Sequence, residues 1–122
     1  MDSILNSIKQ LLGIPADYDV FDVNVLMFIN TAIATLTQLG VGPTEGFSVV
    51  DDTATWDSFL GDDDRLNMVQ TYVYARVRLL FDPPTSSFLV EALEKQAVEL
   101  EWRLNVQREG ESWVDPTETA TP

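Results

Sequence analysis

The sequence contains no cysteine and no histidine. Without cysteine the chain has no disulfide, no thiolate nucleophile and no sulfur ligand for a metal. Without histidine it lacks the side chain that most often serves as general base or metal ligand near neutral pH. Carboxylates, hydroxyls and two lysines are all that remain for catalysis. We therefore expect no enzymatic activity, no cofactor and no metal site.

Positive charge is also scarce. The chain has 7 Lys and Arg against 20 Asp and Glu, which gives a formal net charge of −13. Proteins that bind nucleic acids neutralise phosphates with clustered basic side chains, and no such cluster is present. A surface this acidic repels DNA and anionic membranes. It suits a protein that meets basic patches on partners, or one that lines a passage which DNA crosses without binding.

A long apolar run is missing as well. Residues 23–44 contain no charged side chain, but asparagines, threonines and a glutamine interrupt the segment, and Gly40, Gly42 and Pro43 end it. A membrane-spanning helix needs about 20 predominantly apolar residues, so a membrane span is rejected. The first four residues also lack the basic side chains that are typical of a signal peptide.

The residues that are present favour one all-α domain. Hydrophobic residues make up 45% of the 122, which is enough for a real core. Apolar stripes at helical spacing predict a small bundle of about four helices. Ser3 is a candidate N-cap for the first, Gly13 and Gly40 are stop signals for the first two, and Pro83 ends the third. The expected helices span residues 3–12, 22–39, 62–81 and 87–107.

Two of these helices have unusual surfaces. The outward side of the second has polar but uncharged residues, whereas a solvated helix usually has charges there. It is either a central core helix or a helix covered on its far side by a neighbouring subunit. The third has a wide apolar surface that includes Arg76 and Arg78. We expect these arginines to pair with nearby carboxylates, or across a subunit boundary. The uncharged residues of the second helix are Asn24, Thr31, Thr35 and Gln38.

The connection over residues 41–61 is long for a small domain, and long connections are often functional. Phe47, Val49 and Val50 could form a short strand or an extended arm. Residues 55–60 predict a helical turn with Trp56 pointing inward. Seven acidic residues and no basic one lie between Glu45 and Asp64. The segment is either a solvated acidic loop or an arm of an assembly.

The C-terminal segment is expected to differ from the body. We divide the chain into a helical domain, residues 1–107, and an acidic tail, residues 108–122, which shows no periodicity and is ordered only by a partner. Trp113 and Val114 are its obvious anchor, since a buried tryptophan supplies a large contact area. In the last helix, Trp102 lies away from the apolar stripe, which hints at a contact with another molecule.

Two acidic groups were considered as calcium or divalent-ion sites. The spacing of Asp17, Asp19 and Asp22 fails the EF-hand pattern, because phenylalanine stands at the fifth position and aspartate at the sixth. Helix capping by Asp19 or Asp22 explains them better. Residues 62–64, all aspartates, are explained by the positive end of the helix dipole.

Several short stretches stand out by their order and spacing. They are Leu12-Gly13-Ile14, Phe28-Ile29-Asn30, Gln38-Leu39-Gly40-Val41-Gly42-Pro43, Gly46-Phe47-Ser48, Thr55-Trp56, Phe81-Asp82-Pro83-Pro84-Thr85-Ser86 and Glu101-Trp102-Arg103-Leu104. Together they resemble the head-tail connector (adaptor) family of tailed bacteriophages. The resemblance covers residues 4–107 and leaves the tail unmatched.

The resemblance implies a helical subunit that assembles as a ring, typically a dodecamer, in the neck of the virion after assembly in the host bacterial cytoplasm. One side would dock on the portal protein and the other on a stopper, head-completion or tail protein. DNA would pass through the lumen without specific binding. The second and third helices are the candidates for the ring contact. The candidate interface residues are Phe47, Trp56, Arg76, Arg78, Trp102, Arg108, Trp113 and Val114.

Two other functions stay open from the sequence. A monomeric acidic module, such as an inhibitor or a DNA mimic that binds a basic protein, would gather its acids on one coherent face. A carboxylate-based hydrolase would need a convergent pair of acids, and the sequence nominates none.

Overall fold

The structure is a computed structural model that describes residues 3–61 and 63–112, with side chains described as far as residue 105. Over this part of the chain it is all-α, as predicted, with five helices and no strand. Four correspond to the expected helices, and the fifth is the short turn in the long connection. The helices are α1 (Ile4–Leu12), α2 (Asp22–Gln38), α3 (Trp56–Leu60), α4 (Leu66–Phe81) and α5 (Ser87–Ser112).

The predicted signals at both ends of α1 are confirmed. The Ser3 side chain accepts a hydrogen bond of 3.2 Å from the backbone N–H of Asn6. Gly13 has φ +82°, a left-handed conformation that favours glycine, and its N–H bonds back to the last turn of the helix. These caps satisfy backbone groups that a helix leaves unpaired at its ends.

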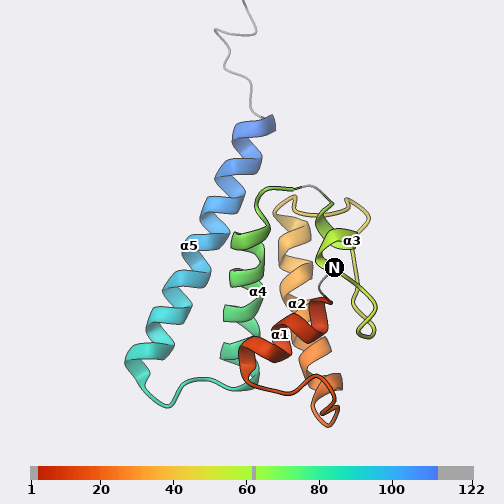
Figure 1. The fold of residues 1–122 in the computed structure, drawn as a ribbon. Coiled ribbons are helices and arrows are strands. Elements are labelled where there is room, and N and C mark those ends of the chain that lie inside the picture. Colours follow the sequence, from red (N-terminus) through yellow and green to blue (C-terminus); the bar gives the residue numbers. More distant parts are fainter. Residues whose placement is uncertain (1–2, 62, 113–122) are drawn as a thin grey trace, which may run out of the picture.

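The three long helices lie in a row, with α4 in the middle (Figure 1). α4 packs against both α2 and α5, whereas α2 and α5 barely touch each other, and α1 crosses α2 and α4. The wide apolar surface of α4 is therefore covered within the subunit. The apolar surface that suggested α4 as a ring contact is thus accounted for within its own subunit, and a ring contact through α4 stays a prediction. The buried residues of α4 are Val69, Tyr72, Val73, Ala75 and Val77.

The connection between α2 and α3 contains no strand in the described residues, so the short strand considered around Phe47 and Val49 is wrong. The Asn30 side chain instead satisfies the Val49 backbone: its amide donates to the carbonyl at 2.9 Å and its oxygen accepts from the N–H at 2.7 Å. The segment is thereby held along α2 as an arm. The predicted helical turn is confirmed as α3, which begins with a capping box between Thr55 and Ser58.

The expected start of one helix and the expected cap of another are corrected. α4 begins at Leu66, and Asp63 accepts hydrogen bonds from the backbone N–H and the guanidinium of Arg65 instead of lying in the first helical turn. α2 has no side-chain cap, so the proposed capping by Asp19 or Asp22 is wrong. Asp22 lies in the first turn of α2 and forms an ion pair with Lys9.

The last helix is longer than predicted. α5 continues to Ser112, so residues 108–112 extend the helix, although the sequence showed no apolar periodicity there. Arg108, Glu109 and Glu111 are good helix formers and favour this extension, whereas Gly110 opposes it. The expected boundary after residue 107 therefore falls inside α5. Trp113 and Val114 lie outside the described residues.

Candidate functional site

A buried lysine, Lys9, stabilises the loop between α1 and α2. Lys9 is 1% exposed, and its Nζ donates to the carbonyl oxygens of Ala16 at 3.0 Å and Tyr18 at 2.8 Å. The same ammonium group lies 2.8 Å from the Asp22 carboxylate. Buried charges are tolerated when they are paired and hydrogen-bonded, so these three contacts account for the burial of Lys9.

A polar network joins α4 to α5. The Tyr72 hydroxyl donates to the Glu101 carboxylate at 2.7 Å, and Arg76 donates to the same hydroxyl at 3.2 Å while it forms an ion pair with Glu101. Burial, and then the bond to Glu101, raise the pKa of Tyr72. Burial lowers the pKa of Arg76, but its bonds to Glu101 and Tyr72 outweigh this and the net pKa shift is upward. Arg76 thus has its carboxylate partner inside the subunit.

Arg78 closes the C-terminal end of α4. Its Nε donates to the backbone carbonyl of Asp82 at 2.6 Å, and a terminal nitrogen donates to the Tyr74 hydroxyl at 3.1 Å. Basic side chains near a helix C-terminus can donate hydrogen bonds to its unpaired carbonyl groups, and they interact favourably with the helix dipole. The expected pairing with a carboxylate side chain is not what the structure shows. Its bonds stabilise the end of α4, and the alternative of pairing across a subunit boundary stays a prediction.

Two aromatic candidates from the arm belong to the core of the subunit. Trp56 is 3% exposed, and its indole N–H donates to the Ser7 hydroxyl at 3.1 Å. Phe47 is half-buried and packs on Phe59, with ring centroids 5.0 Å apart. These contacts account for both side chains within one subunit, so neither offers much free surface to another molecule.

Trp102 differs from these candidates because it is 64% exposed on α5. Two apolar residues that the sequence reading did not select, Phe88 and Val98, are 76% and 59% exposed on the same helix. With Glu91 and Lys95 between them, these residues follow one another in steps of three and four, which places them on one helix face. That spacing was the available signal for the two missed residues.

The outward face of α2 is exposed and uncharged, as predicted. Its inward residues, among them Ile29 and Ile33, are buried, so the helix is covered on one side by its own core and open on the other. Of the two alternatives for this helix, the central core helix is excluded. The exposed residues of the open side are Val23, Asn24, Met27, Thr31, Ala34 and Gln38.

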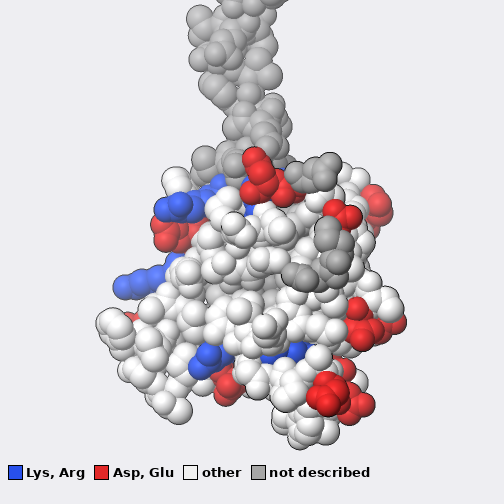
Figure 2. Space-filling view, in the orientation of Figure 1, with Lys and Arg blue, Asp and Glu red and all other residues white. Residues whose placement is uncertain are grey.

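Acidic side chains lie in several separate groups on the face shown in Figure 2, with uncharged surface between them. The arm contributes Asp51, whose pKa is lowered by hydrogen bonds from the Thr53 hydroxyl and backbone N–H. Among the described residues, no group of acids is arranged to hold a metal ion. No helix in the same part of the chain is long and apolar enough to cross a membrane.

A shallow groove of about 900 Å³ lies along α1 and the loop that follows it, with Trp56 of α3 and Gln70 of α4 also in its lining. Uncharged side chains line it, including Asn6, Gln10, Leu11 and Trp56. It contains no titratable group that could act as acid or base. A small all-α subunit with exposed apolar side chains on its outer helices is the class of protein that the described residues define.

Comparison with known families agrees with this class. The model of a family described as phage connector protein matches residues 4–111. The chain therefore belongs to the phage connector protein family. The match begins at the first residue of α1 and ends within the last turn of α5, so it includes the whole helical body. No curated protein and no solved structure matches the chain.

Proposed function

We propose that the chain is a structural subunit of the phage neck that forms a ring, docks on the portal and joins it to the next neck or tail protein. The observation that carries this proposal is the family match over residues 4–111. In this function the protein resides in the virion after assembly in the host bacterial cytoplasm. It performs no catalysis, and the centre of the ring leaves a channel for DNA.

The fold supports a ring because its two outer helices are open on their far sides. α2 and α5 flank α4, and each has an outward face that the subunit itself does not cover. A contact between two different surfaces of identical copies closes into a ring when the rotation between neighbours closes. The net charge of −13 supports the channel, since an acidic lumen offers phosphates no favourable site.

The tail and the last turns of α5 are proposed to contact the portal or the next neck protein. Arg108 lies in the helical part of this segment, and Trp113 and Val114 follow it. A segment that orders on binding meets its entropy cost at the moment of assembly. The three residues stay predicted interface residues.

A monomeric acidic module is less well supported. It requires one coherent acidic face, whereas the acids in Figure 2 lie in separate groups. The family match also points away from an inhibitor.

The test is the mass of the purified chain in solution, alone and with the portal ring of the same phage, by native mass spectrometry or light scattering. We expect a defined number of copies, near a dodecamer, on each portal ring. A chain that remains a monomer beside the portal would overturn the proposal and favour the acidic module.

A further inference from the structure

α5 has two faces, and only one of them is used within the subunit. The residues that pack on α4 include the buried Ala97 and Leu104. At 3.6 residues per turn, the residues with three- and four-residue spacing between Phe88 and Trp102 fall on the opposite side. Three large apolar side chains on that side are exposed over most of their surface. The outward face of α5 is defined by Phe88, Glu91, Lys95, Val98 and Trp102.

The outward face of α2 has a shape that complements the outward face of α5. Its residues also follow in steps of three and four, but the side chains near its middle, Thr31 and Ala34, are small. Helices pack by placing large side chains of one into gaps above small side chains of the other. Trp102 and Val98 are large enough to fill such gaps. The outward face of α2 is defined by Val23, Met27, Thr31, Ala34 and Gln38.

α5 lies at one edge of the row α5–α4–α2, whereas α3 and the arm lie beyond α2 at the other edge, and α2 and α5 run in the same direction (Figure 1). A second copy with the same up-and-down orientation can therefore set its α5 against the part of α2 that α3 and the arm leave exposed. Each copy then still offers one free face for the next. This is the head-to-tail geometry that a ring requires.

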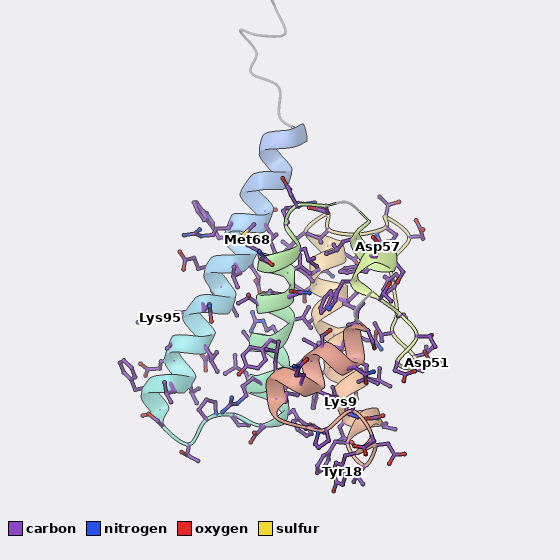
Figure 3. The ribbon with its side chains drawn as sticks, in the orientation of Figure 1. Lys9, Tyr18, Asp51, Asp57, Met68 and Lys95 are labelled. Carbon is purple, nitrogen blue, oxygen red and sulfur yellow. The ribbon has the colours of Figure 1, made fainter. Side chains whose placement is uncertain are left out.

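Charge favours a copy of the same chain as the occupant. Lys95 projects outward from α5, whereas Asp51 and Asp57 lie beyond α2 at the opposite edge of the subunit (Figure 3). Head-to-tail packing brings this lysine towards the acidic edge of the neighbour. The α2 face has no charge, and the α5 face has one acid, Glu91, and one base, Lys95, so the two faces add no net charge to the contact between subunits that each have a net charge of −13.

We infer that the outward face of α5 in one copy packs on the outward face of α2 in the next, with Val98 and Trp102 over Thr31 and Ala34. The inference rests on the proposed function, since it names the contact that closes the ring. Helix α2, with 17 residues, is about 25 Å long, so the contact extends along most of the subunit.

The absence of cysteine makes a sharp experiment possible. Ala34→Cys and Val98→Cys are made separately in the full chain, assembled with the portal ring, and treated with a short bismaleimide. A heterologous contact predicts cross-linked dimers when the two variants are mixed, and none when either variant is alone. The double variant should give a ladder of oligomers. Gln10→Cys, on α1 and outside both faces, replaces Ala34→Cys as the control and should give no product with Val98→Cys.

A second measurement uses no cross-linker. Trp102→Glu should reduce the assembled fraction at least tenfold while the melting temperature of the free subunit stays unchanged. Leu11→Glu, at an exposed apolar residue of α1, is the matched control and should assemble normally.

The outcomes separate the two proposals. Suppose that copies assemble on the portal, that the Ala34→Cys and Val98→Cys variants give no cross-link when mixed, and that Trp102→Glu assembles normally. That result would overturn this contact and leave the ring proposal standing. A wild-type chain that never assembles would overturn both.

Discussion

The Tyr72 hydroxyl lies 2.7 Å from the Glu101 carboxylate and joins the central helix to the outermost one. Tyr72 is fully buried, while Glu101 lies at the edge of the interface, where it also receives Arg76. α5 packs mainly on α4, so this network is a principal polar contact of that helix with the rest of the subunit. The orientation of the proposed assembly face of α5 therefore depends on it.

Replacing Glu101 with Gln should lower the free energy of unfolding by about 1 to 3 kcal/mol, because the change removes one charge from a partly buried, hydrogen-bonded pair. Urea denaturation followed by circular dichroism measures it. Glu99→Gln is the matched control: Glu99 pairs with Arg103 on the exposed surface of the same helix, at 2.9 Å. An exposed pair contributes about 0.5 kcal/mol or less. Equal losses in the two variants would contradict the structural role of the network.

Stability should also fall at alkaline pH through Tyr72. The pKa of this phenol is raised in the folded state by burial and by the bond to Glu101, whereas in the unfolded chain it is about 10. The folded state thus holds the phenol proton of Tyr72 more tightly than the unfolded chain does. The stability that the protonated phenol contributes is complete below a pH of about 10 and is lost as the pH rises towards the folded pKa. Tyr72→Phe should flatten this decline in a series of urea titrations at pH values from about 8 to about 11. If stability falls with pH as steeply in Tyr72→Phe as in the wild type, the raised pKa of Tyr72 makes no contribution to alkaline stability.

Lys9 should be far more important for stability than the other lysine. Lys9→Met leaves two carbonyl groups and the Asp22 carboxylate without their buried partner, which should cost about 2 to 4 kcal/mol. Lys95→Met, on the exposed face of α5, should change stability by less than about 0.5 kcal/mol. Thermal denaturation of both variants tests the difference. A small effect at Lys9 would mean that the loop between α1 and α2 is held by other contacts.

Helix positions could be predicted because they depend on local signals. Ser3 and Gly13 mark α1, and Pro83 follows the end of α4, since capping and proline sterics act over a few residues. The expected start of α4 is too early because Asp63 accepts hydrogen bonds from Arg65, two residues further along the chain, and composition does not reveal that this local contact replaces a helical turn.

The candidate interface residues were harder to predict than the helices. Trp56 and Trp102 are both aromatic residues beside acidic ones in sequence, yet one is buried and the other exposed. Burial depends on which helix face the neighbours cover, and the neighbours are fixed only in three dimensions. The spacing places Val98 on one face of α5, but whether that face is exposed depends on which elements pack on α5, mainly α4.

The glycine at position 42 should be irreplaceable for two reasons. It has φ +81°, and a Cβ there would come within 2.4 Å of the Phe59 ring. Gly13 has nearly the same φ, +82°, but open space around it. Gly13→Ala should therefore cost about 1 to 2 kcal/mol from backbone strain, and Gly42→Ala should cost about 1 to 3 kcal/mol more because the arm must shift. Chemical denaturation of the two variants compares them, and equal costs would show that the Phe59 ring moves freely.

The last prediction separates docking from folding at the C-terminal segment. Trp113→Ala should leave the melting temperature of the free subunit nearly unchanged, since we expect this side chain to bury its surface only against a neck partner. Binding to the portal ring or to the next neck protein should weaken, and because truncating an aromatic anchor typically costs about 2 kcal/mol or more, the dissociation constant should rise by more than about tenfold. Trp102→Ala is the informative comparison, since it should impair contacts between copies more than docking of one copy. Surface plasmon resonance on immobilised portal measures the docking. A fall in the melting temperature as large as the loss of binding would place Trp113 in the core of the subunit.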